Sequence, residues 1–190
     1  MIYALHFMLF AKESAARMSK QRTANLLGAL ACEIADRLDR GLKSHPNQTD
    51  SAAAALNLIG DYDGCSNSAL SRALQLSHTA TVRMVDKHEA AGLVDSRRGE
   101  DRRSVALYLT KAGRKQAHSV VADRNGTLNE ILASLTSRQS DQLASLIEVL
   151  LAAMTESADA ANHICRLCDD VACPPESCPV HQAAEKLAGA

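Results

Sequence analysis

Aromatic residues are scarce in this chain of 190 residues: they make up 3% of it, and Trp is absent. Four Pro and nine Gly are too few for the many turns of a β-sandwich or β-barrel, and they also exclude a collagen-like chain. Hydrophobic residues make up 46%, which excludes a wholly disordered chain, and many of them are Ala, the strongest helix former. The composition therefore predicts a mainly α-helical globular protein with one large or two small domains.

Long hydrophobic runs are also missing. The sequence has no stretch of about 18 or more apolar residues, so we expect no transmembrane helix and no membrane partner. Residues 2–11 are apolar, but no Lys or Arg precedes them, as a signal peptide would require. We interpret this start as packing surface or as a misassigned beginning, and we predict a cytoplasmic protein.

Charge is nearly balanced over the whole chain, with a net value of −1, but it is unevenly distributed. Residues 65–115 contain ten Lys and Arg against five Asp and Glu, so this segment carries +5 and the remainder carries −6. A basic middle between acidic flanks is typical of a module that binds nucleic acid. A solvated basic face would produce the same asymmetry, so charge alone does not decide between the two.

Hydrophobic periodicity predicts several helices and one hairpin. Apolar residues recur at every third or fourth position along most of the chain, whereas residues 104–109 alternate as in a strand. The predicted helices cover residues 14–42, 52–59, 67–74, 78–91 and 111 to about 134, and a sixth begins at 137, carries Leu143 to Met154 and ends near Cys165 and Cys168. The predicted hairpin pairs residues 93–97 with residues 104–109. Side-chain caps for these helices are predicted at Asp50 or Ser51, Ser66, Ser77, Thr110 and Thr136.

Two short helices joined by a tight turn and followed by a hairpin form the pattern of a winged helix-turn-helix. In that arrangement the second helix enters the major groove of DNA by its N-terminal residues, and a basic hairpin tip reaches phosphates or the minor groove. The candidate DNA-binding residues are Ser77, Thr79, Thr81, Arg83 and Lys87 on the helix, and Arg97, Arg98, Arg102 and Arg103 on the wing. Asp101 is expected to hold one of these arginines in place.

Residues 68–94 and 98–113 resemble the MarR family of bacterial transcription regulators. The most specific part is Asp101-Arg102-Arg103 at the wing tip, followed by Leu109-Thr110-x-x-Gly113. The resemblance implies a homodimer that binds double-stranded DNA at a palindromic operator. It also implies repression that a small ligand or oxidation relieves. His88 departs from the family pattern, which usually has Leu there, and we expect its side chain to point inward.

On this resemblance the chain divides into four parts, and the fold class is mainly α with a small β-hairpin wing. Residues 1–49 would form an N-terminal dimerisation helix, and residues 50–112 the winged helix-turn-helix domain. Residues 113–162 would form the C-terminal dimerisation helices, and residues 163–190 a Cys-rich tail.

Four of the six cysteines fall in the tail with the spacing C-x2-C-x4-C-x4-C: Cys165, Cys168, Cys173 and Cys178. This is the spacing of a zinc knuckle with Cys in the His position, and four thiolates can hold one tetrahedral ion. We predict a zinc site, in which His163 or His181 could replace one ligand. An iron–sulfur cluster, redox-active thiols without metal and inert cysteines are the alternatives. The site would either sense metal or redox state or be purely structural.

The remaining two cysteines are expected to play separate parts. Cys32 lies among apolar residues of the first helix, so it is predicted to be a small core residue. Cys65 lies just before a predicted helix N-terminus, where a thiolate is stabilised.

Catalytic motifs are absent from the sequence: it has no phosphate-binding loop, no nucleophile elbow and no His-Glu-x-x-His. We therefore predict a sequence-specific DNA-binding regulator rather than an enzyme. One alternative is the same DNA-binding dimer regulated by a small organic ligand, with a purely structural Cys tail. Another class of function would be a metal or iron–sulfur redox protein, or a protein-interaction module.

Overall fold

The computed structural model describes residues 2–45, 48–99 and 105–189, with side chains from residue 19 onward. The chain forms two compact units, residues 1–40 and 41–190. The first unit is a single helix, α1 (Ile2–Leu42), which begins well before the predicted residue 14. Cys32 on this helix is exposed, so the prediction of a core position for it is wrong. Within the described residues, no helix combines the length and the apolar character needed to cross a membrane.

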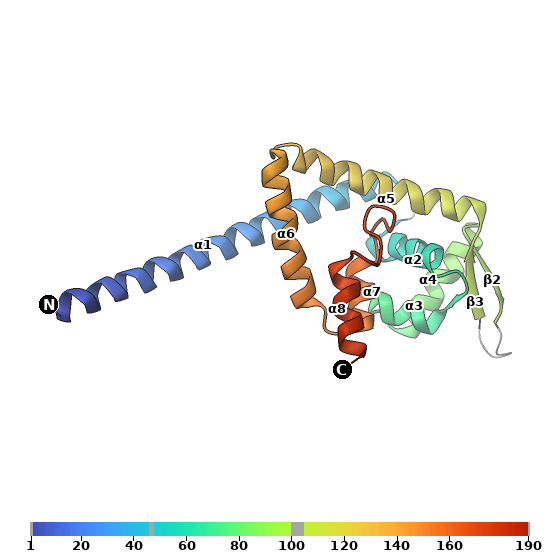
Figure 1. Ribbon diagram of the computed structural model, residues 1–190. Helices are drawn as coiled ribbons and strands as arrows, with labels where there is room; N and C mark the ends of the chain where they lie inside the picture. Colours follow the sequence, from blue (N-terminus) through green and yellow to red (C-terminus); the bar gives the residue numbers. More distant parts are fainter. Residues whose placement is uncertain (1, 46–47, 100–104, 190) are drawn as a thin grey trace. The chain divides into compact units, whose positions relative to one another are not determined.

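The second unit contains the winged helix-turn-helix and the tail (Figure 1). Its helices are α2 (Asp50–Asp61), α3 (Asn67–Leu74), α4 (His78–Ala90), α5 (Lys111–Leu132), α6 (Ser137–Met154), α7 (Ala158–Cys165) and α8 (Pro179–Ala188). Its strands are β1 (Cys65–Ser66), β2 (Val94–Arg98) and β3 (Val105–Leu109). The five helices and two strands predicted for this part are present, whereas β1, α7 and α8 were not predicted.

Side-chain caps fix where these helices begin. Ser66, Ser77 and Thr110 each accept a hydrogen bond from a backbone amide three residues later, as predicted. Thr136 and Gln139 form the predicted capping box at the start of α6. The cap of α2 is Thr49, which accepts from the Ala52 amide, rather than Asp50 or Ser51. The stop signal after α4 is also confirmed, because Gly92 has φ 70°.

The small sheet is antiparallel, with strand order β1-β3-β2. Val94 of β2 pairs with Leu109 of β3 at the open end of the hairpin, and Arg98 pairs with Val105 at the end where β2 connects to β3. The two-residue strand β1 pairs Cys65 with Leu107 on the other side of β3. The hairpin is therefore attached to the helices along its inner strand, and β2 remains the outer strand of the wing.

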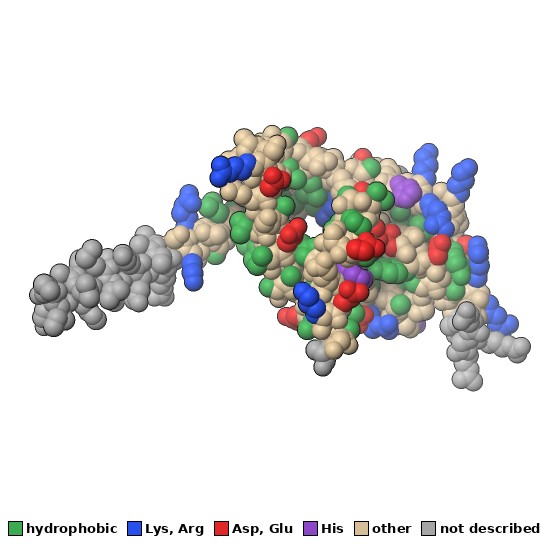
Figure 2. Space-filling model, viewed as in Figure 1, with side chains coloured by type: hydrophobic (Ala, Val, Ile, Leu, Met, Phe, Trp, Pro, Cys, Tyr) green, Lys and Arg blue, Asp and Glu red, His purple; other side chains and the backbone are tan. Residues whose placement is uncertain are grey.

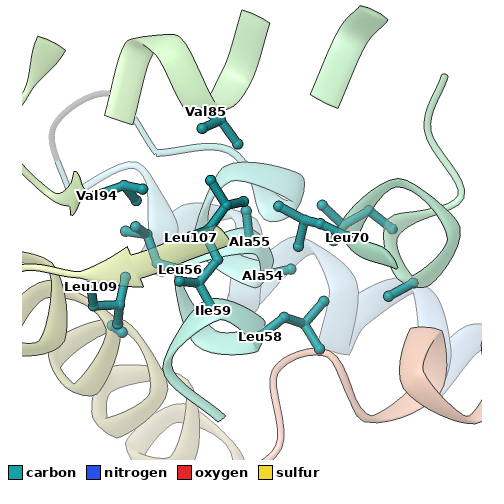
Figure 3. Packing of buried hydrophobic residues seen from close by; sticks show 13 residues of the cluster. Ala54, Ala55, Leu56, Leu58, Ile59, Leu70, Val85, Val94, Leu107 and Leu109 are labelled. Carbon is teal, nitrogen blue, oxygen red and sulfur yellow. The ribbon is translucent and has the colours of Figure 1, made fainter. Parts of the chain in front are cut away.

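The core of the second unit is built around α2. All eight residues from Ala52 to Ile59 are buried. Figure 3 shows Leu56 and Ile59 of this helix facing Leu107 and Leu109 of β3, with Val94 of β2 and Val85 of α4 nearby. The four alanines of α2 are small enough for α3, α5 and β3 to approach the helix closely. Burial of α2 thus fixes the positions of the helices and the sheet around it.

Gly113, near the start of α5, provides a direct test of this packing. A Cβ at this position would lie 2.0 Å from the Leu93 carbonyl oxygen, which belongs to the backbone. We expect Gly113→Ala to lower the free energy of unfolding by about 1–3 kcal/mol or more. Gly126→Ala in the same helix is the matched control, because a Cβ added there would meet no other atom within 4 Å. That control should be stabilised by up to about 1 kcal/mol through helix propensity.

Urea unfolding of both variants beside the wild type is the measurement. Equal stabilities of the two variants would contradict the described packing of α5 against the loop that precedes β2.

Candidate nucleic-acid interface and cysteine cluster

Helix α4 has one exposed face and one buried face. Thr79, Arg83 and Lys87 follow one another at steps of four residues, and all three are exposed. These side chains therefore form a polar and basic row on the outside of α4, which is where the prediction placed them. The opposite face of the helix carries Val85 and His88, both buried.

Thr81 does not lie on the exposed face of α4, where the prediction placed it. Its side chain is fully buried, with 0% exposure, and its hydroxyl donates to the Ser77 carbonyl at 3.1 Å. Thr81 lies four residues before Val85, so the helical period turns both toward the core. Its part is to brace the helix, and the predicted groove contact for Thr81 is wrong.

Ser77 is exposed at the start of α4, and its hydroxyl accepts a hydrogen bond from the Ala80 amide at 3.2 Å. Gln75 in the turn before it has φ 55°, in the left-handed region, which lets α3 and α4 follow one another closely. The N-terminal turn of α4 is thus held rigidly and presented to solvent, together with His78 and Thr79.

His88 points inward, as predicted. It is buried, and its Nε2 lies 3.1 Å from the carbonyl oxygen of Ala52 on α2. Burial lowers the pKa of His88 below its usual value, although the contact with the Ala52 carbonyl opposes this effect. His88 therefore connects α4 to α2, the central helix of the core.

The wing carries exposed arginines on its outer strand. Arg97 Nε lies 2.9 Å from Asp95 Oδ2, and its guanidinium carbon lies 4.4 Å from the centre of the Tyr108 ring. Arg98 is exposed beside it. Asp95, two residues away on the same strand, is a partner that the sequence analysis missed. Arg102, Arg103 and Asp101 lie outside the described residues.

The wing is also attached to α4. The Ser96 amide donates to Glu89 Oε1 at 3.1 Å, so an acidic residue near the end of α4 holds the hairpin. Figure 2 shows Lys and Arg side chains gathered at the end of the second unit that carries the hairpin and the start of α5. The basic residues of α4 and of the wing therefore belong to one supported substructure.

Cys65 differs from its prediction. Burial raises the pKa of its thiol to about 11, and the nearby Asp63 carboxylate adds to this effect. The prediction of a stabilised thiolate at this helix start is therefore wrong, because burial outweighs the helix N-terminus here.

The four tail cysteines meet in space, as their spacing predicts. The Cys165 thiol contacts the side chains of Cys168 and Cys178, and Cys173 in turn contacts Cys178. They come from the end of α7, from the connection after it and from the start of α8 (Figure 1).

The pKa values of Cys165, Cys168 and Cys173 are shifted in different directions. A hydrogen bond from the Cys165 thiol lowers the pKa of Cys168 to about 7, and the Arg124 guanidinium contributes to the lowering. The same interaction raises the pKa of Cys165 far above its usual value, because its proton is held by its neighbour. Burial and the charge of Cys178 raise the pKa of Cys173 to about 11. Among the described residues, no group of three or more His, Cys, Asp or Glu side chains is already arranged to hold a metal ion.

Comparison with known proteins identifies the middle of the chain. Residues 49–104 match the model of the MarR family. The transcriptional repressor MprA of Escherichia coli strain K12 is 30% identical over 90 residues, which are 47% of this chain and 51% of that protein. The chain thus spans about half the length of the curated relatives that it matches.

Two solved structures share the fold. A MarR family protein from Bacillus stearothermophilus has a TM-score of 0.66 at 23% identity, covering 74% of this chain and 98% of that one. Streptococcus pneumoniae FabT, solved in complex with DNA, has a TM-score of 0.60 at 19% identity, covering 68% of this chain and 93% of that one. The predicted fold class, mainly α with a small β-hairpin wing, is confirmed.

The buried His88 makes stability depend on pH. Its pKa is lower in the folded state than in the unfolded state, so the contribution is fully present above about pH 6.5 and is lost as the pH falls toward the folded-state value. We expect the free energy of unfolding to fall by up to about 1.4 kcal/mol per pH unit below about pH 6.5. The variant His88→Leu should show a shallower fall.

Urea unfolding at pH 7.5 and pH 5.5 is the measurement. His118→Gln, which changes an exposed histidine of α5, is the control and should keep the wild-type pH dependence. An unchanged slope in His88→Leu would show that this histidine is not the group that titrates.

Proposed function

We propose that the protein is a transcription regulator that binds double-stranded DNA and acts as a repressor, because residues 49–104 match the model of the MarR family. The observation that carries this proposal is the exposed row on α4, Thr79, Arg83 and Lys87, next to the arginines of the wing. Both elements are braced on the core by Thr81, His88 and Glu89, so the basic groups project from a rigid support.

The chemistry of this row suits the major groove. Ser77 and Thr79 at the start of α4 are short polar side chains that can approach base edges and phosphates. Arg83 presents a planar guanidinium that can donate two parallel hydrogen bonds to guanine. Lys87, one turn farther along, is a point charge suited to a phosphate. The reading face is then Ser77, Thr79, Arg83 and Lys87, without Thr81.

The wing serves the backbone and the minor groove. Arg97 is held by Asp95 and stacks on Tyr108, whereas Arg98 at the C-terminal end of β2 is exposed. The adjoining sequence adds Arg102 and Arg103, so four guanidinium groups belong to one hairpin. A narrow minor groove attracts arginine through its negative potential.

A homodimer follows from the unpartnered face of α6. Leu146, Leu150 and Met154 lie at steps of four residues along this helix, and none of the residues of α6 is buried in the chain. Monomeric proteins rarely expose such a continuous apolar row. On α1, Leu26, Leu27 and Leu30 are exposed as well, within the other unit. Two copies joined through these helices would present two reading helices to a palindromic operator.

We propose that the four tail cysteines hold a metal ion or respond to redox state and so affect DNA binding. A small organic effector with a purely structural tail is the competing input. It predicts DNA binding that does not change when the cysteines are replaced.

Arg83→Ala should weaken DNA binding by about 1–3 kcal/mol where the guanidinium contacts a base edge. Arg102→Ala and Arg103→Ala should weaken binding by a similar amount where they contact base edges. Affinities are measured by fluorescence anisotropy on the operator and on a long random duplex over a series of salt concentrations. Neutralisation of several phosphates gives a steep fall of affinity with salt.

Arg138→Ala, which removes an exposed arginine from the start of α6, is the matched control and should bind as the wild type does. If the wild type shows no salt-dependent binding to either duplex, the proposed function is refuted. If Arg83→Ala and the Arg138→Ala control bind equally, α4 is not the reading helix.

The double variant Leu146→Gln, Leu150→Gln should dissociate the dimer, because each change places a polar amide in the apolar row. Sedimentation equilibrium measures the mass over a range of concentrations. Glu148→Gln on the same helix is the control for a change that leaves the apolar row intact. A wild type that sediments as a monomer at every concentration would contradict the dimer.

A further inference from the structure

Three successive backbone turns bring the tail cysteines together. The amides of Cys168, Cys173 and Cys178 donate to backbone carbonyls three or four residues earlier, at 2.8, 2.9 and 3.0 Å. Asp169 Oδ1 accepts from the amides of Val171 and Ala172, which orders the middle turn. The spacing of the cysteines along the chain is thereby converted into a cluster in space.

Cys178 contributes a sulfur that the helix itself does not use. It is the N-cap of α8, but its side chain accepts no hydrogen bond from the helix. It is buried, and its sulfur contacts Cys165 and Cys173. The Cys178 sulfur is therefore placed to interact with the other cysteines rather than with its own helix.

We propose that Cys165, Cys168, Cys173 and Cys178 hold one tetrahedral divalent ion, zinc, and that this ion fixes the tail against α2 and α3. Four thiolates complete the coordination of zinc and leave no open position, so the site is structural or regulatory and not catalytic.

Binding the ion requires changes in protonation and in side-chain rotation. Each cysteine that is still a thiol releases its proton to solvent as its sulfur–zinc bond forms. The thiols touch one another in a chain, from Cys168 through Cys165 and Cys178 to Cys173. They therefore have to turn inward to surround one ion.

The flanking histidines already have other partners. His163 Nδ1 lies 3.1 Å from the carbonyl oxygen of Ala73, and His181 Nε2 lies 3.4 Å from Glu185 Oε1. Cysteine sulfurs alone therefore supply the four ligands, which is the donor set that zinc shares with iron–sulfur clusters.

Apolar packing gives the connection between α7 and α8 little support. Leu167 packs against the core, whereas Val171 is 93% exposed. The Asn57 side chain on α2 donates to the carbonyls of Arg166 and Cys168, at 3.3 Å each. An ion at the cysteines would join this connection to α8 and hold it where Asn57 can reach it.

The tail touches the helix that supports the reading helix. Two residues of α7 contact α3. His163 contacts the Ala73 carbonyl, and Asp159 Oδ1 lies 3.4 Å from Arg72 Nε. Helix α8 packs against α6 as well as against α7 (Figure 1). The ion would therefore fix a segment that contacts both α3 and α6. An effect of the ion on DNA binding, through these contacts with α3 and α6, rests on the proposed function.

The test uses the full chain, purified without oxygen and without chelators. Elemental analysis should find about one zinc per chain and no iron or sulfide. After removal of zinc, titration with Co²⁺ should produce the charge-transfer and visible bands of a tetrahedral thiolate site. Cys168→Ser and Cys173→Ser should each weaken metal affinity at least tenfold, since even changes outside the ligands cost about 10–100-fold.

The double variant Cys32→Ser, Cys65→Ser is the matched control, because it removes the two cysteines outside the cluster and should keep the ion. Hydrogen exchange reports on the tail: residues 158–188 should exchange faster after zinc removal and recover when zinc is restored. This readout works on the wild type, so it does not depend on whether a variant folds.

Several results would overturn the site. Iron together with sulfide would show that the cysteines hold an iron–sulfur cluster instead of a single ion. Disulfides without metal would show that they are redox-active thiols. Absence of any metal, or tail exchange that is the same with and without zinc, would refute the proposal outright. A protein that holds zinc but shows no salt-dependent DNA binding refutes the proposed function and leaves the site intact. A protein that contains no metal as purified but still binds DNA with the expected salt dependence refutes only the zinc site.

Discussion

Complete burial of α2 is the constraint on which the rest of the second unit depends. Every residue from Ala52 to Ile59 is enclosed, so every face of this helix has a neighbour. Such a helix is possible because Ala occupies half of these positions and lets α3, α5 and β3 come close. Two polar groups of α2 then connect it to distant segments. The Ala52 carbonyl oxygen contacts the His88 imidazole on α4, and the Asn57 side chain donates hydrogen bonds to backbone carbonyls of the tail. Added volume along α2 would displace several elements at once.

Helix α4 shows which of its features could be predicted from the sequence. Its bounds and its Ser77 cap were predictable because they depend on local propensity and on a single hydroxyl. The same period places Thr79, Arg83 and Lys87 outside and Thr81, Val85 and His88 inside. Thr81 was nevertheless expected to read DNA, because its short polar side chain suited that part. Strict use of the helical period with Val85 as the reference would have placed it in the core.

Features that depend on distant partners could not be predicted. Strand β1 has two residues and exists only because β3 pairs with it. The inert state of Cys65 depends on burial, which no local pattern around it reveals. Helices α7 and α8 are short, with eight and ten residues, so each offers only two or three turns in which a hydrophobic period could be recognised. Cysteine spacing did predict that four sulfurs meet, because it is the spacing at which a zinc knuckle places four ligands around one ion. It could not predict that Asn57 of the core would bind the connection they enclose.

Magnitudes indicate which interaction controls the tail. The ion pairs Arg72–Asp159 and Arg166–Asp50 are at least partly exposed, and pairs of this kind contribute about 0–1 kcal/mol each. The Asn57 hydrogen bonds contribute about 0.5–1.5 kcal/mol each. A structural zinc ion in a small site binds with about 10–16 kcal/mol at neutral pH. A thiolate-bound ion would therefore outweigh all of these contacts together. Helix α7 contacts α3, and α8 contacts α6. Loss of the ion would therefore weaken the support of both α3, which is proposed to support α4, and α6, which is proposed to join two copies of the chain.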